Sequence, residues 1–284
     1  MPLPWQQVEL QFRAHLMTTG KRPATCKTYI SNVRTFAEWC AQREADIATV
    51  EPYIISLYLV EILDRLEHNT AALRLSCIRS FYSFCRFRGW RTDDPTLDLS
   101  IKWEDKPPRQ PFAQGEISAL LAACYCDRDR AMITLAYDCG LRISEVIGIR
   151  EANIDVAQGV IYMVGKGGKL GWCVPSTRAF AAILPFLGQR DGILWWTRDH
   201  RPLTAKAAQN NMEWIAKRAG VRAHWHKLRT SFANEAIKAG VRLEDLQVLM
   251  RHSDIKTTRH YAGAALDMRA LSVARQLNFA GELT

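Results

Sequence analysis

No uninterrupted apolar run in this sequence approaches the roughly 18 residues that a membrane-spanning helix needs. The first residues, MPLPWQQVELQF, lack the charged segment and following apolar segment of a secretory signal peptide. The eight cysteines form no CxxC pair, and no histidine pair lies near them at zinc-finger spacing. These absences argue against a membrane protein, a secreted disulfide scaffold and a zinc finger. We therefore expect a reduced, intracellular protein of the cytoplasm.

The chain also has no internal repeat and no low-complexity tract. Its composition is globular, with 284 residues of which 48 % are hydrophobic and 24 % charged, and this length suggests about two domains. Lys and Arg total 38 against 29 Asp and Glu, a net charge of +9. Most of that excess, +7, falls in residues 111–284. An excess of this sign favours a polyanionic partner, most simply nucleic acid.

Apolar spacing predicts an all-helical N-terminal domain. Apolar side chains recur at helical spacing after Pro23 and again from Tyr53 to Leu66. Asn69-Thr70 then offers a cap for a helix that continues to about residue 88. The polar, proline-rich stretch that ends at Pro111 is typical of an interdomain linker. The predicted organisation is a first domain over 1–104, a linker over 105–111 and a second domain over 112–284.

The second domain is predicted to mix helices with a small sheet. Residues Gly159 to Val164 alternate as a strand does, and Gly167-Gly168 supplies a hairpin turn before a second strand through Val174. The predicted fold class is therefore mainly α with a small β-sheet. Helices are predicted at 114–124, 127–139, 176–188, 204–219, 229–239, 243–250 and 264–278.

Basic side chains of this domain gather in a few segments. The densest is His224-Trp-His-Lys-Leu-Arg229, with Arg251-His252 and Tyr261 downstream and Gly140-Leu-Arg-Ile-Ser-Glu145 and Gly165-Lys-Gly-Gly-Lys169 upstream. Paired guanidiniums can hold the nonbridging oxygens of a phosphodiester and stabilise its pentacoordinate transition state. A phenol activated by nearby cations can attack the phosphorus, and a lysine or histidine can protonate the leaving oxygen. This set suits attack on a phosphodiester without a metal.

These segments resemble the tyrosine recombinase (phage integrase) family, in a two-domain, Xer-like or integrase-like form. The family pattern joins Gly-Leu-Arg-x-x-Glu, a Gly-Lys-Gly hairpin lysine, His-x-Leu-Arg, Leu-Gly-His and a tyrosine nine residues beyond that histidine. The matching residues here are Arg142, Glu145, Lys166, His226, Arg229, His252 and Tyr261. The resemblance runs over about 112–265, and the N-terminal helices with Asp94-Pro95 fit the family's SAM-like core-binding domain. One departure is Arg251, which stands where the pattern has Gly and adds bulk and charge beside the site.

The resemblance implies a catalytic role for each of these residues. Tyr261 would attack the scissile phosphate to form a 3′-phosphotyrosyl enzyme, and Arg142 and Arg229 would bind the nonbridging oxygens. Lys166 would be the general acid toward the 5′ oxygen, His226 a base or proton shuttle, His252 a hydrogen-bond donor to the phosphate, and Glu145 an orienting group for arginine. The phosphotyrosyl bond conserves the energy of the broken bond, so no ATP, metal or other cofactor is expected. The two domains would form a clamp around double-stranded DNA, and the protein would associate with the nucleoid.

Each of these residues, taken alone, also has an ordinary structural interpretation without catalysis. A lone arginine is most often a solvated charge, hairpin lysines are surface charge by default, and a lone tyrosine is usually a half-buried aromatic. His224 and His226 would suggest a metal pair on an extended segment, but no third ligand is evident. His224 is therefore expected to pack or to contact DNA, and no metal site is predicted. The ordered set at the family's spacing favours the joint interpretation.

Three other functions compete with a site-specific recombinase. A type IB topoisomerase-like relaxing enzyme would share the arginines, the lysine and the tyrosine. A non-catalytic DNA-binding regulator is a second alternative, because Ala239 to Tyr261 resembles a helix-turn-helix with Gly240 near the first break. A metal-dependent nuclease or transposase would need convergent carboxylates, and the acidic residues here are scattered.

Two further features concern DNA and assembly. Basic residues of the N-terminal helices, interleaved with aromatics, suit phosphate contacts and would make binding salt-dependent. The candidates are Lys27, Arg34, Arg74, Arg79 and Arg86. Residues 264–279 have the pattern of an amphipathic helix, which by the resemblance would dock on a neighbouring protomer in a tetramer on synapsed DNA. A second recombinase or accessory proteins are also possible partners.

Overall fold

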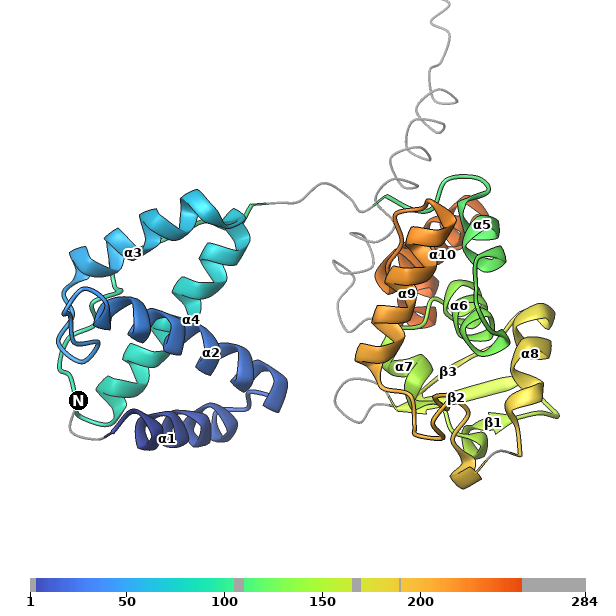
Figure 1. Cartoon of the computed structure of the whole chain (residues 1–284), viewed down its shortest axis with the longest axis horizontal. Coiled ribbons are helices and arrows are strands. Elements are labelled where there is room, and N and C mark those ends of the chain that lie inside the picture. The colour runs from blue at the N-terminus through green and yellow to red at the C-terminus, as the bar shows by residue number, and fades with distance from the viewer. Residues whose placement is uncertain (1–3, 105–109, 165–169, 189, 252–284) are drawn as a thin grey trace, which may run out of the picture. The chain divides into compact units, whose positions relative to one another are not determined.

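The structure is a computed structural model that describes residues 4–104, 110–164, 170–188 and 190–251. The chain divides into two compact units, Met1–Lys106 and Pro107–Thr284, and each is described by itself (Figure 1). The predicted fold class is confirmed, because the described chain is mostly helical and carries one three-stranded sheet.

The described part of the first unit is a packed set of four helices. They are α1 (Trp5–Thr18), α2 (Pro23–Ala41), α3 (Pro52–Arg65) and α4 (His68–Phe87). Both α2 and α3 begin with proline, whose missing N–H removes no helical hydrogen bond at that position. Helix α4 packs against the other three, and its Phe81 and Phe84 lie 5.4 Å and 5.3 Å, centroid to centroid, from the ring of Phe12 in α1. The predicted all-helical first domain therefore agrees with the described residues of this unit, whose helices pack around an aromatic core.

The predicted cap at Asn69-Thr70 is wrong. Helix α4 begins at His68, and Glu67 is the residue that precedes it. The Asn69 side chain binds the backbone of Glu104 instead: its amide donates to the carbonyl (2.9 Å), and its oxygen accepts from the N–H (2.8 Å). The Asn69 side chain, which the local sequence predicts to cap the helix, therefore binds a residue 35 positions away along the chain.

The second unit is built around helix α6 (Asp127–Cys139), whose predicted bounds are confirmed. Residues 131–136 are all buried, as expected for a helix that is covered on several sides. Helix α6 packs against both α8 (Thr177–Ile183) and α10 (Trp225–Lys238). The other helices are α5 (Glu116–Ala122), α7 (Ile143–Gly148), α9 (Ala205–Ala219) and α11 (Leu243–Leu249), with 3₁₀ turns η1 (Glu151–Asn153), η2 (Leu184–Phe186) and η3 (Arg190–Gly192).

The sheet has the antiparallel order β1-β2-β3, with β1 at Ile154–Asp155, β2 at Val160–Val164 and β3 at Leu170–Cys173. The predicted hairpin is confirmed, since β2 and β3 pair with Met163 opposite Gly171. Met163 is buried, whereas Tyr162 and Trp172 are exposed. The sheet therefore packs one face on the core of the unit. Strand β1 was not predicted.

The helix expected at 114–124 is shorter by two residues at each end, and two predicted helices differ from the observed ones by four residues or more. The helix expected at 176–188 ends at Ile183 and continues only as the 3₁₀ turn η2, because Pro185 cannot donate the next helical hydrogen bond. The helix expected at 229–239 begins four residues earlier, at Trp225. The predicted helix at 264–278 lies outside the described residues.

The cysteines and acidic residues of the described ranges form no metal centre. All eight cysteines are free, and all but Cys126 are buried. In the part of the chain that the structure describes, no group of three or more His, Cys, Asp or Glu side chains could hold a metal ion. No described helix is long and apolar enough to cross a membrane.

Candidate active site

Gly140 brings the end of α6 against α10. It follows Cys139 with a φ of 60°, the left-handed conformation that ends many helices and favours glycine. A Cβ at this position would overlap the ring of Phe232 on α10. Leu141, the next residue, is fully buried. The Gly-Leu pair therefore sets the short connection that delivers Arg142 to the start of α7.

Arg142 and Glu145 form a closed local pair at that helix start. Arg142 precedes α7 in an extended conformation, and the Glu145 carboxylate accepts the Arg142 backbone N–H at 2.8 Å. The Arg142 guanidinium returns to the same carboxylate at 2.7 Å. This is half of a capping box with an added ion pair, and it explains the three-residue spacing of the motif. The Arg142 side chain is 31 % exposed, whereas that of Glu145 is 4 % exposed.

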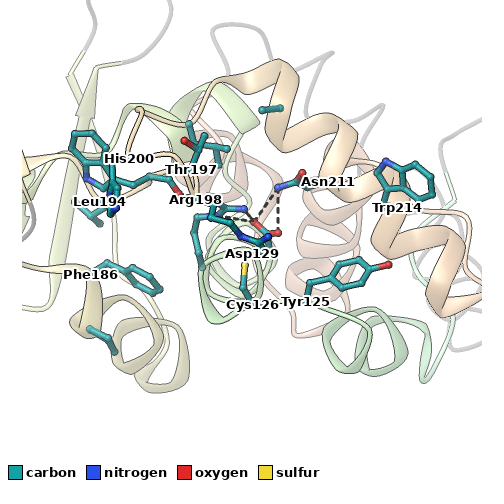
Figure 2. Close-up of a pocket in the computed structure, with 15 residues that line it drawn as sticks. Tyr125, Cys126, Asp129, Phe186, Leu194, Thr197, Arg198, His200, Asn211 and Trp214 are labelled. Atoms are coloured by element: carbon teal, nitrogen blue, oxygen red, sulfur yellow. Dashed lines mark hydrogen bonds and ion pairs between the residues drawn. The ribbon is translucent and has the colours of Figure 1, made fainter.

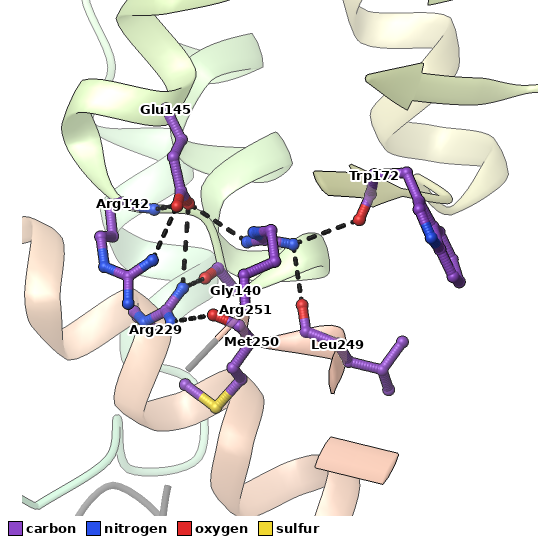
Figure 3. Close-up of polar contacts among 8 residues, drawn as sticks. All are labelled: Gly140, Arg142, Glu145, Trp172, Arg229, Leu249, Met250 and Arg251. Carbon is purple, nitrogen blue, oxygen red and sulfur yellow. Dashed lines mark hydrogen bonds and ion pairs between the residues drawn. The ribbon is translucent and has the colours of Figure 1, made fainter. Parts of the chain in front are cut away.

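Arg229 reaches the same place from α10. Its side chain has no exposed surface, and its two terminal nitrogens donate to the carbonyls of Gly140 and Met250 (Figure 3). Its Nη1 lies 3.9 Å from Oε2 of Glu145. A buried guanidinium needs such acceptors, because an unpaired charge in the interior is strongly destabilising. The fold therefore brings together two arginines that lie far apart in the sequence.

A third guanidinium completes the cluster. Arg251, which follows α11, donates from Nη2 to Oε2 of Glu145 at 3.1 Å, and its side chain is 10 % exposed. Sequence reasoning noted Arg251 only as a departure from the family pattern. The signal was a charged residue at a position where the pattern has glycine.

The Glu145 carboxylate thus pairs with three guanidiniums. Burial opposes ionisation of Glu145 and by itself raises its pKa, but the charge of Arg251, the Arg142 backbone N–H and the Arg142 guanidinium outweigh burial and lower the pKa of Glu145. With Glu145 ionised, Arg142, Arg229 and Arg251 leave the cluster with a net charge of +2. A partly exposed guanidinium in such a cluster is suited to bind a phosphate.

The first turn of α10 explains much of the His-Trp-His-Lys-Leu-Arg segment. His224 is the cap of the helix, and its Nδ1 accepts the Lys227 backbone N–H at 2.9 Å. Trp225 is buried, and Lys227 donates to Glu116 at 3.0 Å. His226 is exposed and lies one turn before Arg229. Packing and DNA contact were the roles expected for His224, and capping was not among them. The available signal was a histidine directly before a helical pattern.

The remaining predicted site residues lie beyond what the structure describes. Lys166 falls between β2, which ends at Val164, and β3, which begins at Leu170. His252 and Tyr261 follow Arg251, the last described residue. The described structure therefore brings together Arg142, Glu145 and Arg229, and places His226 on the same helix as Arg229.

Four of the five predicted DNA-contact cations bind groups in their own unit. Arg34 pairs with Glu9 (2.6 Å), Arg86 with Asp94 (3.8 Å), Arg79 donates to the Leu99 carbonyl (2.6 Å) and Arg74 to the Tyr58 hydroxyl (3.0 Å). Lys27 is exposed on α2. The side chains of Arg34 and Arg86 are about half exposed, which leaves room for a second partner.

A cavity of about 830 Å³ lies at the other end of α6 (Figure 2). It is lined by residues that include Tyr125, Phe186 and Trp214, and its buried Asp129 accepts from the amide of Asn211 at 3.2 Å. Asp129 is in the first turn of α6 and Gly140 follows the last, so about 15 Å of helix separates them at 1.5 Å per residue. The cavity is thus separate from the arginine cluster.

Comparison with known proteins identifies relatives for both units. The model of the phage integrase family matches residues 112–267, and that of the phage integrase N-terminal SAM-like domain matches residues 10–89. Tyrosine recombinase XerD of Caulobacter vibrioides is 31 % identical over 242 residues, which are 78 % of each chain. Tyrosine recombinase XerD of Pseudomonas aeruginosa is 28 % identical over 264 residues, covering 87 % of this chain and 88 % of the relative.

Solved structures share the fold at low sequence identity. The XerH site-specific recombinase bound to a palindromic difH substrate has a TM-score of 0.75 at 17 % identity, covering 96 % of this chain and 84 % of that one. A lambda integrase dimer bound to a core site has a TM-score of 0.74 at 16 % identity, covering 90 % and 76 %. The predicted family resemblance is thus confirmed by sequence, and the fold agrees with it. The chain belongs to the phage integrase family, the tyrosine recombinases that cleave and rejoin DNA.

Proposed function

We propose that this protein is a site-specific DNA recombinase that cuts and rejoins DNA strands through a covalent bond to Tyr261. The observation that carries the proposal is the meeting of Arg142 and Arg229 at Glu145, from α7 and α10. A pair of guanidiniums oriented by one carboxylate is suited to stabilise the negative charge of a phosphodiester in its transition state. The family membership supports the same reaction.

The two arginines have different access in this proposal. The Arg142 side chain is partly exposed, so it is the first of the two to contact the nonbridging oxygens of the phosphate. Arg229 has no exposed surface and holds the Met250 carbonyl, so its contact with phosphate requires this carbonyl to be released or shared. Glu145 orients both side chains and does not touch DNA.

The covalent steps conserve the phosphodiester energy. The Tyr261 oxygen attacks the phosphorus, the bond to the 5′ oxygen breaks, and this oxygen takes a proton from Lys166 and leaves as a hydroxyl. His226 takes or relays the tyrosine proton, and His252 donates a hydrogen bond to the phosphate. A 5′-hydroxyl of the partner strand then reverses the step. No ATP, metal or other cofactor takes part.

Capture of the covalent intermediate tests the reaction. A suicide DNA substrate, nicked near the cleavage site so that the released strand diffuses away, traps the 3′-phosphotyrosyl protein from a library of candidate sites. Tyr261→Phe is expected to abolish the adduct, and Tyr125→Phe, an exposed tyrosine near the other end of α6, is the matched control. An adduct that survives Tyr261→Phe would overturn the proposal.

Two alternatives make different predictions. A topoisomerase-like enzyme would relax supercoils as a monomer without paired sites. A non-catalytic regulator would bind its site and never form the adduct. The regulator has one structural feature in its favour, since α10 and α11 are joined by a short turn in which Gly240 has a φ of 90°. However, α10 also carries Arg229 into the cluster with Glu145, which a binding helix would not need.

The proposed partner is double-stranded DNA that carries a recombination site, held in a clamp formed by residues 1–104 and 112–284 with 105–111 as linker. Lys27, Arg34, Arg74, Arg79 and Arg86 are proposed phosphate contacts. The active assembly is a tetramer on synapsed DNA, joined through the C-terminal segment, with a second recombinase or accessory proteins as possible members. The expected location is the cytoplasm, at the nucleoid.

A further inference from the structure

Arg251 has a backbone conformation that arginine rarely adopts. Its φ is 54°, in the left-handed region that favours glycine, and its N–H donates to the Val248 carbonyl at 2.9 Å to close the turn after α11. An L side chain stays in this region only when its surroundings hold it. The contacts of the Arg251 side chain supply these surroundings.

The guanidinium of Arg251 joins three elements (Figure 3). Its Nη2 donates to Glu145 on α7 at 3.1 Å, and its Nη1 donates to the carbonyl of Leu249, at the end of α11, at 2.7 Å. The same Nη1 lies 3.4 Å from the carbonyl of Trp172 on β3. The side chain thus connects the carboxylate that serves Arg142 and Arg229 with the returning strand of the β2–β3 hairpin.

The aliphatic stem of Arg251 (its Cγ and Cδ atoms) explains why residue 171 is a glycine. A Cβ at position 171 would lie 2.7 Å from Cδ and 3.2 Å from Cγ of Arg251. Gly171 pairs with Met163 within the ladder and has no left-handed φ, so the backbone itself does not require glycine there. Space for Arg251 is the requirement, and the two residues form an interlocking pair.

We propose that Arg251 is a positioning residue of the recombinase active site, which holds Glu145 in place for Arg142 and Arg229 and fastens strand β3 to the same carboxylate. Arg251 acts through Glu145 and β3 and does not contact DNA. When Arg142 turns from Glu145 toward a phosphate, Arg251 remains as the buried partner of the carboxylate. This inference rests on the proposed function for its catalytic readout only.

The first test is single-turnover cleavage of a suicide substrate at saturating DNA. Arg251→Gly suits the positive φ and removes both the stem and the charge. It is expected to lower the cleavage rate about 10- to 100-fold, the usual effect of losing a group that orients a reacting one, while DNA affinity changes less than about twofold. Arg251→Lys keeps the positive charge but not the two terminal nitrogens of the guanidinium, and is expected to recover part of the cleavage rate.

The pH profile separates this role from a merely structural one. Glu145 faces Arg142, Arg229, Arg251 and, on β3, Cys173. Loss of the Arg251 charge raises the pKa of Glu145, so the acidic limb of the cleavage rate is expected to move to higher pH in Arg251→Gly and to stay in place in Arg251→Lys. A uniform loss of rate at every pH would overturn the proposal. So would weaker DNA binding with a smaller salt dependence, the sign of a direct phosphate contact.

A double-mutant cycle tests the geometry without activity. Gly171→Ala is expected to lower the thermal midpoint in the wild-type background and to have little further effect beside Arg251→Gly, because the overlapping stem is gone. Gly148→Ala, where a Cβ meets open space, is the matched control. Equal effects of Gly171→Ala in both backgrounds would overturn the interlocking pair. If the wild-type protein forms no Tyr261 adduct, the recombinase proposal fails, and this cycle still decides the Arg251 contact.

Discussion

Neutralising Glu145 is the change that the arginine cluster should tolerate least. Glu145→Gln keeps the shape of the side chain but removes the carboxylate that, among the described residues, pairs with Arg142, Arg229 and Arg251. Breaking a buried ion pair on one side destabilises by about 3–5 kcal/mol, because the other charge stays buried. Arg142 is 31 % exposed and can be hydrated, so we expect the lower end, about 3 kcal/mol.

The pH dependence of this loss has a defined sign. The pKa of Glu145 is lowered in the folded protein, so its contribution to stability is fully present above its ordinary value of 4.5 and is lost as the pH falls through the folded-state pKa. The wild-type protein loses this contribution on acidification, whereas Glu145→Gln has none to lose. The stability gap between the two proteins should therefore narrow as the pH falls below 4.5 and close once the pH is below the folded-state pKa of Glu145.

Hydrogen exchange at increasing urea, followed on peptides from α6 and α7 of the full chain, measures this stability without assuming that the two units unfold together. Glu235→Gln is the control, because the Glu235–Lys238 pair at 2.8 Å is more than half exposed on both sides and should change stability by less than about 0.5 kcal/mol. A loss for Glu145→Gln no larger than for this control, or a gap that persists at acid pH, would refute the reasoning.

Three further changes probe the same region. Gly140→Ala forces a Cβ into the ring of Phe232 at a positive φ and should destabilise the protein by about 2–4 kcal/mol in urea unfolding, whereas Gly148→Ala should be neutral; similar midpoints for both would contradict this. His224→Ala removes the cap of α10 and should destabilise by about 1 kcal/mol, with His224→Asn restoring stability; no recovery by asparagine would argue against capping. Arg142→Lys keeps the positive charge but not the bidentate guanidinium, and should slow single-turnover cleavage about 100-fold with little change in DNA affinity. An equal loss in DNA affinity would show that Arg142 acts in binding alone.

Local patterns predicted the parts of the fold whose causes are local. Helix α6 has acidic residues in its first turn, a continuous apolar run and Gly140 at its end, so its bounds follow from the sequence. The pairing of β2 with β3 follows in the same way from the alternating residues of the first strand and the Gly-Gly sequence after it. The start of α4 was misplaced because Asn69 binds Glu104, a distant residue that no local pattern reveals.

The sequence by itself determined the family, the helical fold with its small sheet and the identity of the candidate arginines, because each depends on residue types at fixed spacing. Only the tertiary structure decided how their charges are balanced. The enclosure of Arg229, the sharing of Glu145 among three guanidiniums and the fit of the Arg251 stem over Gly171 join α7, α10, β3 and the end of α11. Such contacts depend on which elements pack together, since burial makes each charge require a partner wherever the fold supplies one.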